Sequence, residues 1–218
     1  MPIADRGTSF TPGKIRFTYS DDNGSSWHLT EVKLKSLYRD RIEFQEPGIF
    51  ELPDGRLWAY MRTAYGHQYQ SFSSDGGETW TTPMPNFYFT SPDSPMLLKK
   101  VGERAVAIFN PTPYSCVNEL TEVWKSPRRT PYVCAISNDG GLSFDSTGKV
   151  CSNGGLADFA KSSVLLEDDL SNGYCYPAVI ETKDGFLVAY YHSNGTGVCL
   201  NSTKVTKVTW DELAEAIS

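Results

Sequence analysis

The stretch SFSSDGGETW, residues 71–80, places two glycines and a tryptophan behind an aspartate, as a tight turn does. Its pattern, S-x-D-x-G-x-x-W, recurs at residues 20–27 (SDDNGSSW) and, with Phe in place of Trp, at residues 137–144 (SNDGGLSF). The aspartates of successive copies are 53 and 64 residues apart. Three copies in one chain predict a repeat architecture.

Each fixed position of this motif has a physical role. The aspartate carboxylate can accept hydrogen bonds from main-chain N–H groups of its own turn, and the glycine supplies a backbone angle that other residues resist. We expect the aromatic residue to anchor the turn in the core. The segments IRFTYS, HQYQSFS and YVCAIS, which precede the copies, alternate as strands do, so the motif predicts a turn between antiparallel strands.

Hairpin signals fill the intervals between the copies. Asp54-Gly55 and Asp184-Gly185 each separate two apolar alternating runs. The layout predicts an all-β chain, a single β-propeller segment of about three and a half blades. Its expected parts are an N-terminal extension (1–14), a half blade (15–45), three blades (46–92, 93–172 and 173–208) and a C-terminal tail (209–218).

The tail, TWDELAEAIS, offers two interpretations. Thr209 as N-cap and Glu212 as its N3 partner predict a short helix. A frayed terminus is the alternative.

Composition excludes several function classes. The 218 residues are 39% apolar and 21% charged, as in soluble globular proteins, and the net charge of -6 argues against nucleic-acid binding. The sequence contains neither an export signal nor about 18 apolar residues in a row, so it predicts no membrane span and leaves the compartment open. The five cysteines form no CxxC pair, and we expect buried free thiols.

The repeated motif resembles the Asp-box of the sialidase (neuraminidase) superfamily, whose members are six-bladed β-propellers. The resemblance extends through residues 46–80 and through the strings RRTPYVCAISNDGG and YPAVIETKDGFLVAYYH, and covers most of the chain from residue 15 to about 208. In the family the Asp-box lies at the blade periphery and also occurs in non-enzymes. Function must therefore be judged from other residues.

The resemblance implies a site for terminal sialic acid, whose anomeric carbon carries a carboxylate. In the family three arginines bind this anion, because a planar guanidinium matches a carboxylate bidentately. A tyrosine acts as the nucleophile and a glutamate takes its proton. Because an unperturbed phenol ionises near pH ~10, these two residues must be neighbours.

Three charged residues match this pattern by their place in the blades. Glu46 opens the first strand of a blade and Arg62 closes the second, as the family's glutamate and one of its arginines do. Arg129, at the start of a third strand, matches a further arginine, with Arg128 as the alternative. Taken singly, these residues are more often solvated or paired at a surface, and only their joint order favours a site.

Tyr176 in CYPAV matches the nucleophile, and Tyr174 lies one alternate position away, on the same face of a regular strand. A lone tyrosine is more often a core aromatic. Asp93, Ser94 and Asn110 at strand ends are candidates for contacts with sugar hydroxyls or, alternatively, for turn capping.

The resemblance is incomplete at the N-terminus. The family's general-acid aspartate and the first arginine of its triad have no convincing match in MPIADRGTSFTPGK, residues 1–14. An open partial ring exposes strand edges and apolar faces. We therefore expect missing N-terminal blades or a second copy of the chain to complete it.

Two function classes remain. The first is an exo-acting, retaining glycoside hydrolase for terminal sialic acid or a related acidic sugar. The second is a non-catalytic propeller that binds an acidic glycan or a protein partner. The expected ligand in the first case is a sialylated or acidic glycan, and neither class requires a metal or another cofactor. An aspartate reaching the pocket as general acid would distinguish them.

Overall fold

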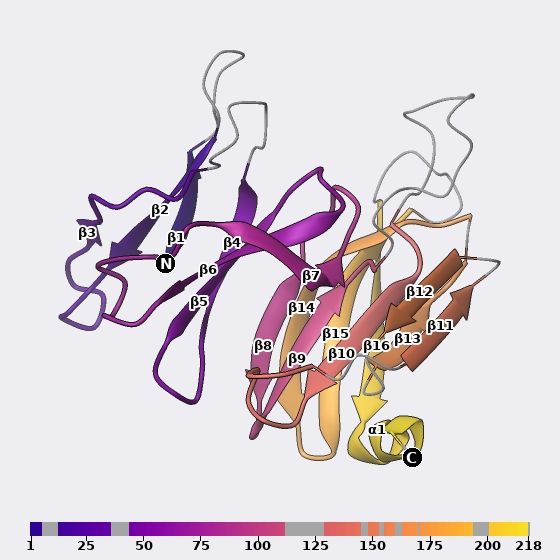
Figure 1. Ribbon diagram of the computed structural model, residues 1–218. Helices are drawn as coiled ribbons and strands as arrows, with labels where there is room; N and C mark the ends of the chain where they lie inside the picture. Colours follow the sequence, from indigo (N-terminus) through magenta and orange to yellow (C-terminus); the bar gives the residue numbers. More distant parts are fainter. Residues whose placement is uncertain are drawn as a thin grey trace, which may run out of the picture.

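A computed structural model describes residues 1–5, 13–35, 44–111, 129–144, 148–152, 155–159, 163–169, 171–193 and 201–217. In these ranges the chain is built of β-strands and ends in a short helix (Figure 1). The all-β class predicted from the sequence is confirmed. No helix in the same ranges has the length and apolar character needed to cross a membrane.

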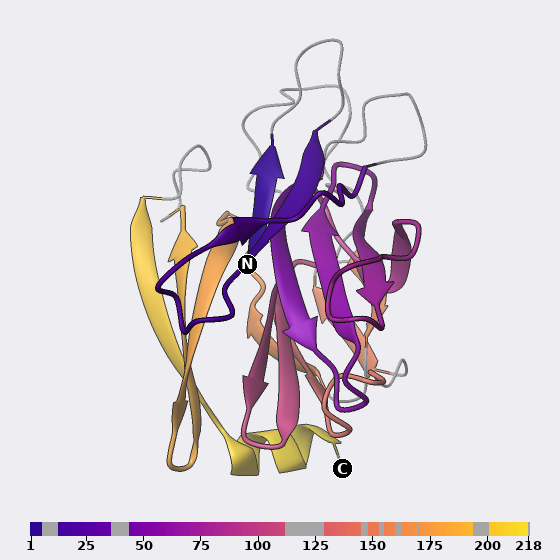
Figure 2. The ribbon, with the colours of Figure 1, turned by 90° about the vertical axis from the view of Figure 1, so that its left-hand side faces the viewer.

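The described strands form four larger antiparallel sheets that follow one another in chain order (Figures 1 and 2). The first contains β1 (Pro2–Asp5), β2 (Lys14–Tyr19) and β3 (His28–Leu29). The second contains β4 (Gln45–Glu51), β5 (Leu57–Arg62), β6 (His67–Ser73) and β7 (Met84–Thr90). The third contains β8 (Leu97–Val101), β9 (Arg104–Phe109), β10 (Tyr132–Ser137) and β13 (Ser163–Glu167). The fourth contains β14 (Tyr174–Thr182), β15 (Gly185–His192) and β16 (Ser202–Thr209). A hairpin of β11 (Gly148–Ser152) and β12 (Gly155–Phe159) precedes β13, and α1 (Trp210–Ile217) follows β16.

The first strand of each sheet lies at one edge, because successive strands pair as hairpins. The β4–β5 and β14–β15 turns hold Asp54-Gly55 and Asp184-Gly185, as predicted. These edge strands meet one another in three of the sheets, since β8 contacts both β4 and β14. The second, third and fourth sheets therefore share a line of contact along these strands, and the candidate site lies there.

Apolar clusters hold consecutive sheets together. In β5, Trp58 and Tyr60 join the cluster shared with the third sheet, whereas Ala59 and Met61 join the one shared with the first. Successive side chains of a strand face opposite sides of its sheet, so both sides of this sheet are buried. The inner strands β5, β9 and β10 are apolar at nearly every position for the same reason.

The three Asp-box turns share one hydrogen-bond arrangement. In the second copy Ser73 Oγ donates to Asp75 Oδ1 and accepts from the Gly77 N–H, both at 2.8 Å. Asp75 Oδ1 also accepts from the Thr79 N–H at 2.9 Å. The corresponding bonds recur in the other copies, at Ser20, Asp22, Gly24 and Ser26 and at Ser137, Asp139, Gly141 and Ser143. The predicted role of the aspartate is confirmed.

The motif's aromatic residue packs against the core in the second and third copies and is exposed in the first. Trp80 stacks on Phe17 of the first sheet, with ring centres 4.4 Å apart, and Phe144 contacts Phe89 of the second sheet, with ring centres 5.1 Å apart. Trp27 is 57% exposed, so the predicted core anchor is wrong for the first copy. The aromatic packs on the preceding sheet, and within the described residues no sheet precedes the first.

The C-terminal tail is a packed helix. The Thr209 N–H donates to Glu212 Oε2 at 2.8 Å, and the Glu212 N–H donates to Thr209 Oγ1 at 3.3 Å. This reciprocal pair is the predicted capping box. Leu213 is buried in the cluster between the third and fourth sheets, which anchors the helix.

Two of the five cysteines have described side chains. Cys134 and Cys175 are buried free thiols, as predicted. Cys116, Cys199 and the side chain of Cys151 lie outside the described residues.

We expect Gly141→Ala to destabilise the fold more than Gly55→Ala. Both glycines have positive φ, 100° and 83°, so alanine costs about 1–2 kcal/mol at either position. A methyl group at Gly141 would also lie 2.9 Å from Phe50, whereas nothing lies within 4 Å of one at Gly55. Urea unfolding measures the difference in unfolding free energy. Equal losses would contradict the packing argument.

The Asp-box carboxylates should make stability depend on acid pH. Hydrogen bonds from Ser26 and Thr79 lower the pKa values of Asp22 and Asp75 to about 2, below the ~3.9 of an unfolded aspartate. Because the folded pKa is the lower one, their stabilisation is present above about pH 4 and is lost as the pH falls towards about 2. Asp75→Asn, which cannot titrate, should melt below the parent at neutral pH, with a difference that shrinks in acid. A difference independent of pH would refute this linkage.

Candidate active site

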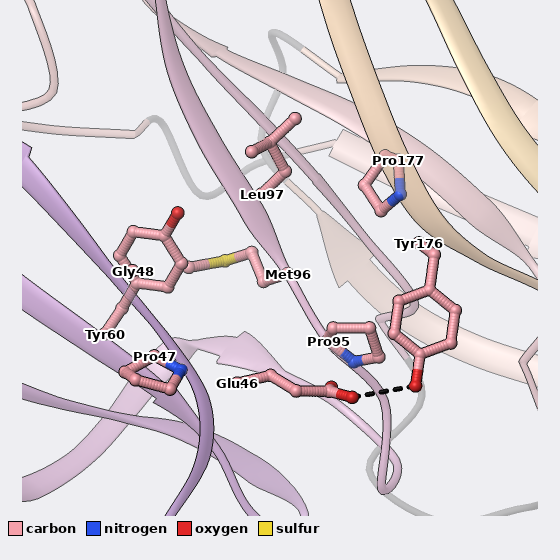
Figure 3. A pocket seen from close by; sticks show the side chains of 9 residues that line it. All are labelled: Glu46, Pro47, Gly48, Tyr60, Pro95, Met96, Leu97, Tyr176 and Pro177. Atoms are coloured by element: carbon pink, nitrogen blue, oxygen red, sulfur yellow. Dashed lines mark hydrogen bonds between the residues drawn. The ribbon is translucent and has the colours of Figure 1, made fainter. Parts of the chain in front are cut away.

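A hydrogen bond between residues 130 positions apart lies at the centre of the candidate site. Tyr176 Oη donates to Glu46 Oε1 at 2.7 Å (Figure 3). Glu46 lies at the start of β4 and Tyr176 at the start of β14, and β8 contacts both strands. The structure thus brings together the glutamate and the tyrosine that the sequence places in different blades.

Glu46 and Tyr176 occupy matching β-bulges. Each precedes a proline, Pro47 or Pro177, and each has a left-handed backbone, with φ of 44° and 54°. Pairing passes from Gln45↔Arg62 to Gly48↔Tyr60 in the second sheet, and from Cys175↔Tyr191 to Ala178↔Ala189 in the fourth. Two residues thus oppose one in both sheets, which re-aims the side chain at the bulge.

Tyr174 is not part of the site. It is 3% exposed and packs against Tyr132 and Tyr190, with ring centres 6.2 and 6.1 Å away. Tyr176, in contrast, is 44% exposed. The prediction that the two tyrosines share a face is wrong, because the bulge at Tyr176 interrupts the alternation of the strand.

Arg62 is a buried cation held between two carboxylates. Its side chain is 10% exposed; Nη1 donates to Glu46 Oε2 at 2.8 Å and Nε to Asp93 Oδ1 at 2.7 Å. Burial opposes its charge, but hydrogen bonds and charge attraction from Asp93 and Glu46 outweigh burial and raise the pKa of the guanidinium. Arg62 is therefore charged, and its removal would leave two carboxylates without their partner.

Asp93 connects the two arginines. Its carboxylate pairs with Arg62, and its main-chain oxygen accepts from Arg129 Nη2 at 3.0 Å. From the sequence, Asp93 was a candidate either for contact with a sugar hydroxyl or for turn capping, and its ion pair with Arg62 was not predicted. One signal was present: Asp93 comes shortly before β8, the first strand of the third sheet, and Glu46 lies near the start of β4, the first strand of the second.

Arg129 lies on the tyrosine side of the site. Its carbonyl accepts from the Tyr174 N–H at 2.9 Å, and its Cζ is 5.9 Å from the centre of the Tyr176 ring. Nη1 contacts Cys175 Sγ at 2.7 Å. Burial raises the pKa of that thiol to about 11 despite the nearby guanidinium, so the thiol is neutral. Arg128 lies outside the described residues.

Ser94 and Asn110 are fully buried and contact each other. Ser94 Oγ donates to Asn110 Oδ1 at 2.6 Å, and Asn110 Nδ2 donates to the Pro131 carbonyl at 3.1 Å. Gln68 Nε2 donates to the Ser94 carbonyl at 2.9 Å. This network supports the backbone on either side of the site, next to Asp93 and two residues after Arg129.

A cavity of about 320 Å³ opens beside the central pair (Figure 3). Its mostly apolar wall comes from the second, third and fourth sheets and consists of Glu46, Pro47, Gly48, Tyr60, Pro95, Met96, Leu97, Tyr176 and Pro177. A methyl group at Gly48 would lie 2.0 Å from the Tyr60 ring, so only glycine fits there. Desolvation, followed by the hydrogen bond to Glu46, raises the pKa of Tyr176, so its phenol is protonated at neutral pH.

Comparison with known proteins identifies the family of the chain. Residues 7–211 match the BNR repeat-like domain family. The anhydrosialidase of Macrobdella decora is 38% identical over 77 residues, which are 35% of this chain and 10% of that protein.

Solved structures share the fold. The Ruminococcus gnavus intramolecular trans-sialidase superposes with a TM-score of 0.60 at 19% identity, over 97% of this chain and 41% of its own. The leech intramolecular trans-sialidase superposes with a TM-score of 0.61 at 20% identity, over 98% of this chain and 30% of its own. Trypanosoma rangeli sialidase superposes with a TM-score of 0.57 at 14% identity, over 94% of this chain and 28% of its own. The fold is that of sialidase β-propellers, and the chain spans less than half the length of each of these proteins.

We expect Glu46→Gln to lower the pKa of Tyr176. The carboxylate raises this pKa through its hydrogen bond and its charge, and glutamine keeps an acceptor without the charge. The phenolate absorbance of each protein would be followed as the pH is raised. Subtracting the absorbance of the same protein with Tyr176→Phe removes the contribution of the other tyrosines. Asp93→Asn, whose carboxylate contacts Arg62 instead, is the control and should change the pKa less. An unchanged pKa in Glu46→Gln would contradict the pairing.

Proposed function

The chain belongs to the BNR repeat-like domain family, and from that premise we propose that it acts as a sialidase-type glycoside hydrolase. Its substrate is a glycan with a terminal sialic acid or a related acidic sugar. The observation that carries the proposal is the Tyr176–Glu46 hydrogen bond, with Arg62 and Arg129 in contact with the same two residues.

The arginines bind the carboxylate of the sugar. Arg62 uses Nε and one Nη1 hydrogen for Asp93 and Glu46, and a guanidinium has five N–H groups. Arg129 donates to neutral partners among the described residues, the Asp93 carbonyl and the Cys175 thiol. Its charge is therefore the less compensated of the two, and we assign it the larger share of anion binding.

Tyr176 is the nucleophile and Glu46 its base. The phenol oxygen forms a bond to the anomeric carbon as the bond to the leaving oxygen breaks, and the phenol proton passes to Glu46 Oε1. Water then attacks the same carbon and loses a proton to the solvent, the tyrosine–sugar bond breaks, and Tyr176 regains its proton from Glu46. Two displacements at one carbon retain the configuration. A neutral nucleophile suits this substrate, because a carboxylate nucleophile would be repelled by the substrate's own carboxylate.

The leaving group determines which substrate tests these roles. An alkyl aglycone needs a proton from a general acid, and we assign that role to no described residue, since Asp93 is ion-paired with Arg62. An aryl aglycone leaves as a stabilised phenoxide without one. Hydrolysis of a 4-methylumbelliferyl sialoside therefore tests Tyr176 and Glu46 without the need for a general acid.

We expect the chain to hydrolyse this aryl sialoside, and Tyr176→Phe to lower kcat by about 100-fold or more through loss of the nucleophile. Tyr191→Phe is the matched control: its ring lies 6.3 Å from that of Tyr176, and kcat should stay within about twofold. Fluorescence of the released phenol measures turnover.

Equal turnover by Tyr176→Phe and the parent would exclude Tyr176 as nucleophile. A folded parent that binds free sialic acid but does not release the phenol would exclude the hydrolase and favour a glycan-binding propeller. Product analysis by NMR, begun within the first minutes, would show the anomer expected for retention.

A further inference from the structure

We propose that Pro47 and Pro177 are positioning residues: each holds the preceding residue in the left-handed conformation that directs Glu46 and Tyr176 towards each other. The catalytic meaning of this inference rests on the proposed function. Its geometric content is independent of any activity.

The unusual backbone is concentrated at the site. Among the described residues, the non-glycine residues with positive φ are Asn23, Glu46 and Tyr176. Asn23 lies in an Asp-box turn, and asparagine tolerates this conformation better than most residues. Glutamate and tyrosine have no such tolerance, yet both adopt it, in two different sheets, and their side chains are hydrogen-bonded to each other. Their backbone conformation is thus linked to the pair.

The following proline explains why this conformation is chosen. The first residue of a β-bulge is commonly near the right-handed helical region, or in the left-handed region when it is glycine. Proline clashes with a preceding residue in the right-handed helical region. With Pro47 and Pro177 at the second bulge position, the common conformation is disfavoured at Glu46 and Tyr176, and both residues have positive φ in the structure.

Proline also suits the wall of the cavity. A bulge leaves its extra residue outside the ladder, and an unpaired N–H facing an apolar cavity is unfavourable. Proline has no N–H. Pro47 and Pro177 both line the cavity beside the central pair (Figure 3). At these two bulge positions the chain therefore places no unpaired N–H group against the cavity.

A third proline provides an internal comparison. Pro95 lines the same cavity, but it precedes the first paired residue of β8, Leu97, and lies outside the ladder. Ser94 before it is not among the residues of positive φ. A proline in this cavity therefore does not by itself impose the left-handed conformation; the combination of proline and bulge does.

The test compares Pro177→Ala and Pro47→Ala with Pro95→Ala by crystallography of the chain. In Pro177→Ala we expect Tyr176 to move to negative φ and its hydroxyl to leave Glu46, with a separation above about 3.5 Å. Pro47→Ala should move Glu46 in the same way. Pro95→Ala should keep both conformations and the hydrogen bond.

Kinetics on the aryl sialoside gives the second readout. In Pro177→Ala we expect kcat to fall about tenfold or more, with KM within about twofold, because the arginines that bind the carboxylate are unchanged. Tyr191→Phe, the control used above, should retain the parent kcat. A purely structural role of the proline would change stability without this separation of kcat from KM.

Retention of positive φ and of the Tyr176–Glu46 bond in both Pro47→Ala and Pro177→Ala would overturn the inference. Loss of the bond in these variants, with a parent that does not hydrolyse the sialoside, would uphold the positioning and reject the proposed function. Loss of the bond with an unchanged kcat would overturn the role of these prolines in catalysis.

Discussion

The pairing of one buried cation connects the parts of the site. A guanidinium out of contact with water needs carboxylate partners, because the desolvation of an unpaired charge costs several kcal/mol. Arg62 takes one partner from its own sheet, Glu46, and one from the next, Asp93. The second oxygen of Glu46 accepts from Tyr176 in the fourth sheet. One ion thereby links three consecutive sheets at the edge where their first strands meet.

The two ends of the sheets use positive φ in different ways. At the Asp-boxes the left-handed positions belong to glycines and one asparagine, and a carboxylate with several N–H and O–H donors holds each turn. At the site they belong to a glutamate and a tyrosine, each followed by proline. The boxes stabilise the scaffold with favourable local chemistry. The site keeps an unfavourable backbone at two residues whose side chains are hydrogen-bonded to each other.

The charge arrangement suits an anionic ligand on the proposed reaction path. Arg62 is largely neutralised by its two carboxylates, whereas Arg129 contacts a carbonyl, a thiol and the face of Tyr176. A protonated tyrosine adds no negative charge where a carboxylate would bind. Glu46 is close enough to take the phenol proton. Because Arg62 compensates the negative charge of Glu46, this carboxylate repels an anionic ligand less than an unpaired one would.

The sequence by itself determined the local chemistry. The Asp-box turns, the hairpin turns at Asp54-Gly55 and Asp184-Gly185 and the helix cap at Thr209 follow from short-range hydrogen bonds and backbone preferences, which a sequence displays directly. The resemblance to sialidases also indicated Glu46, Arg62, Arg129 and Tyr176. Tertiary structure decided what depends on distant neighbours: the exposure of Trp27, the burial of Tyr174, the ion pair of Asp93 and the bulges that turn Glu46 and Tyr176 together. These features depend on contacts between sheets and on interrupted pairing, and neither is encoded in the spacing of residues along one strand.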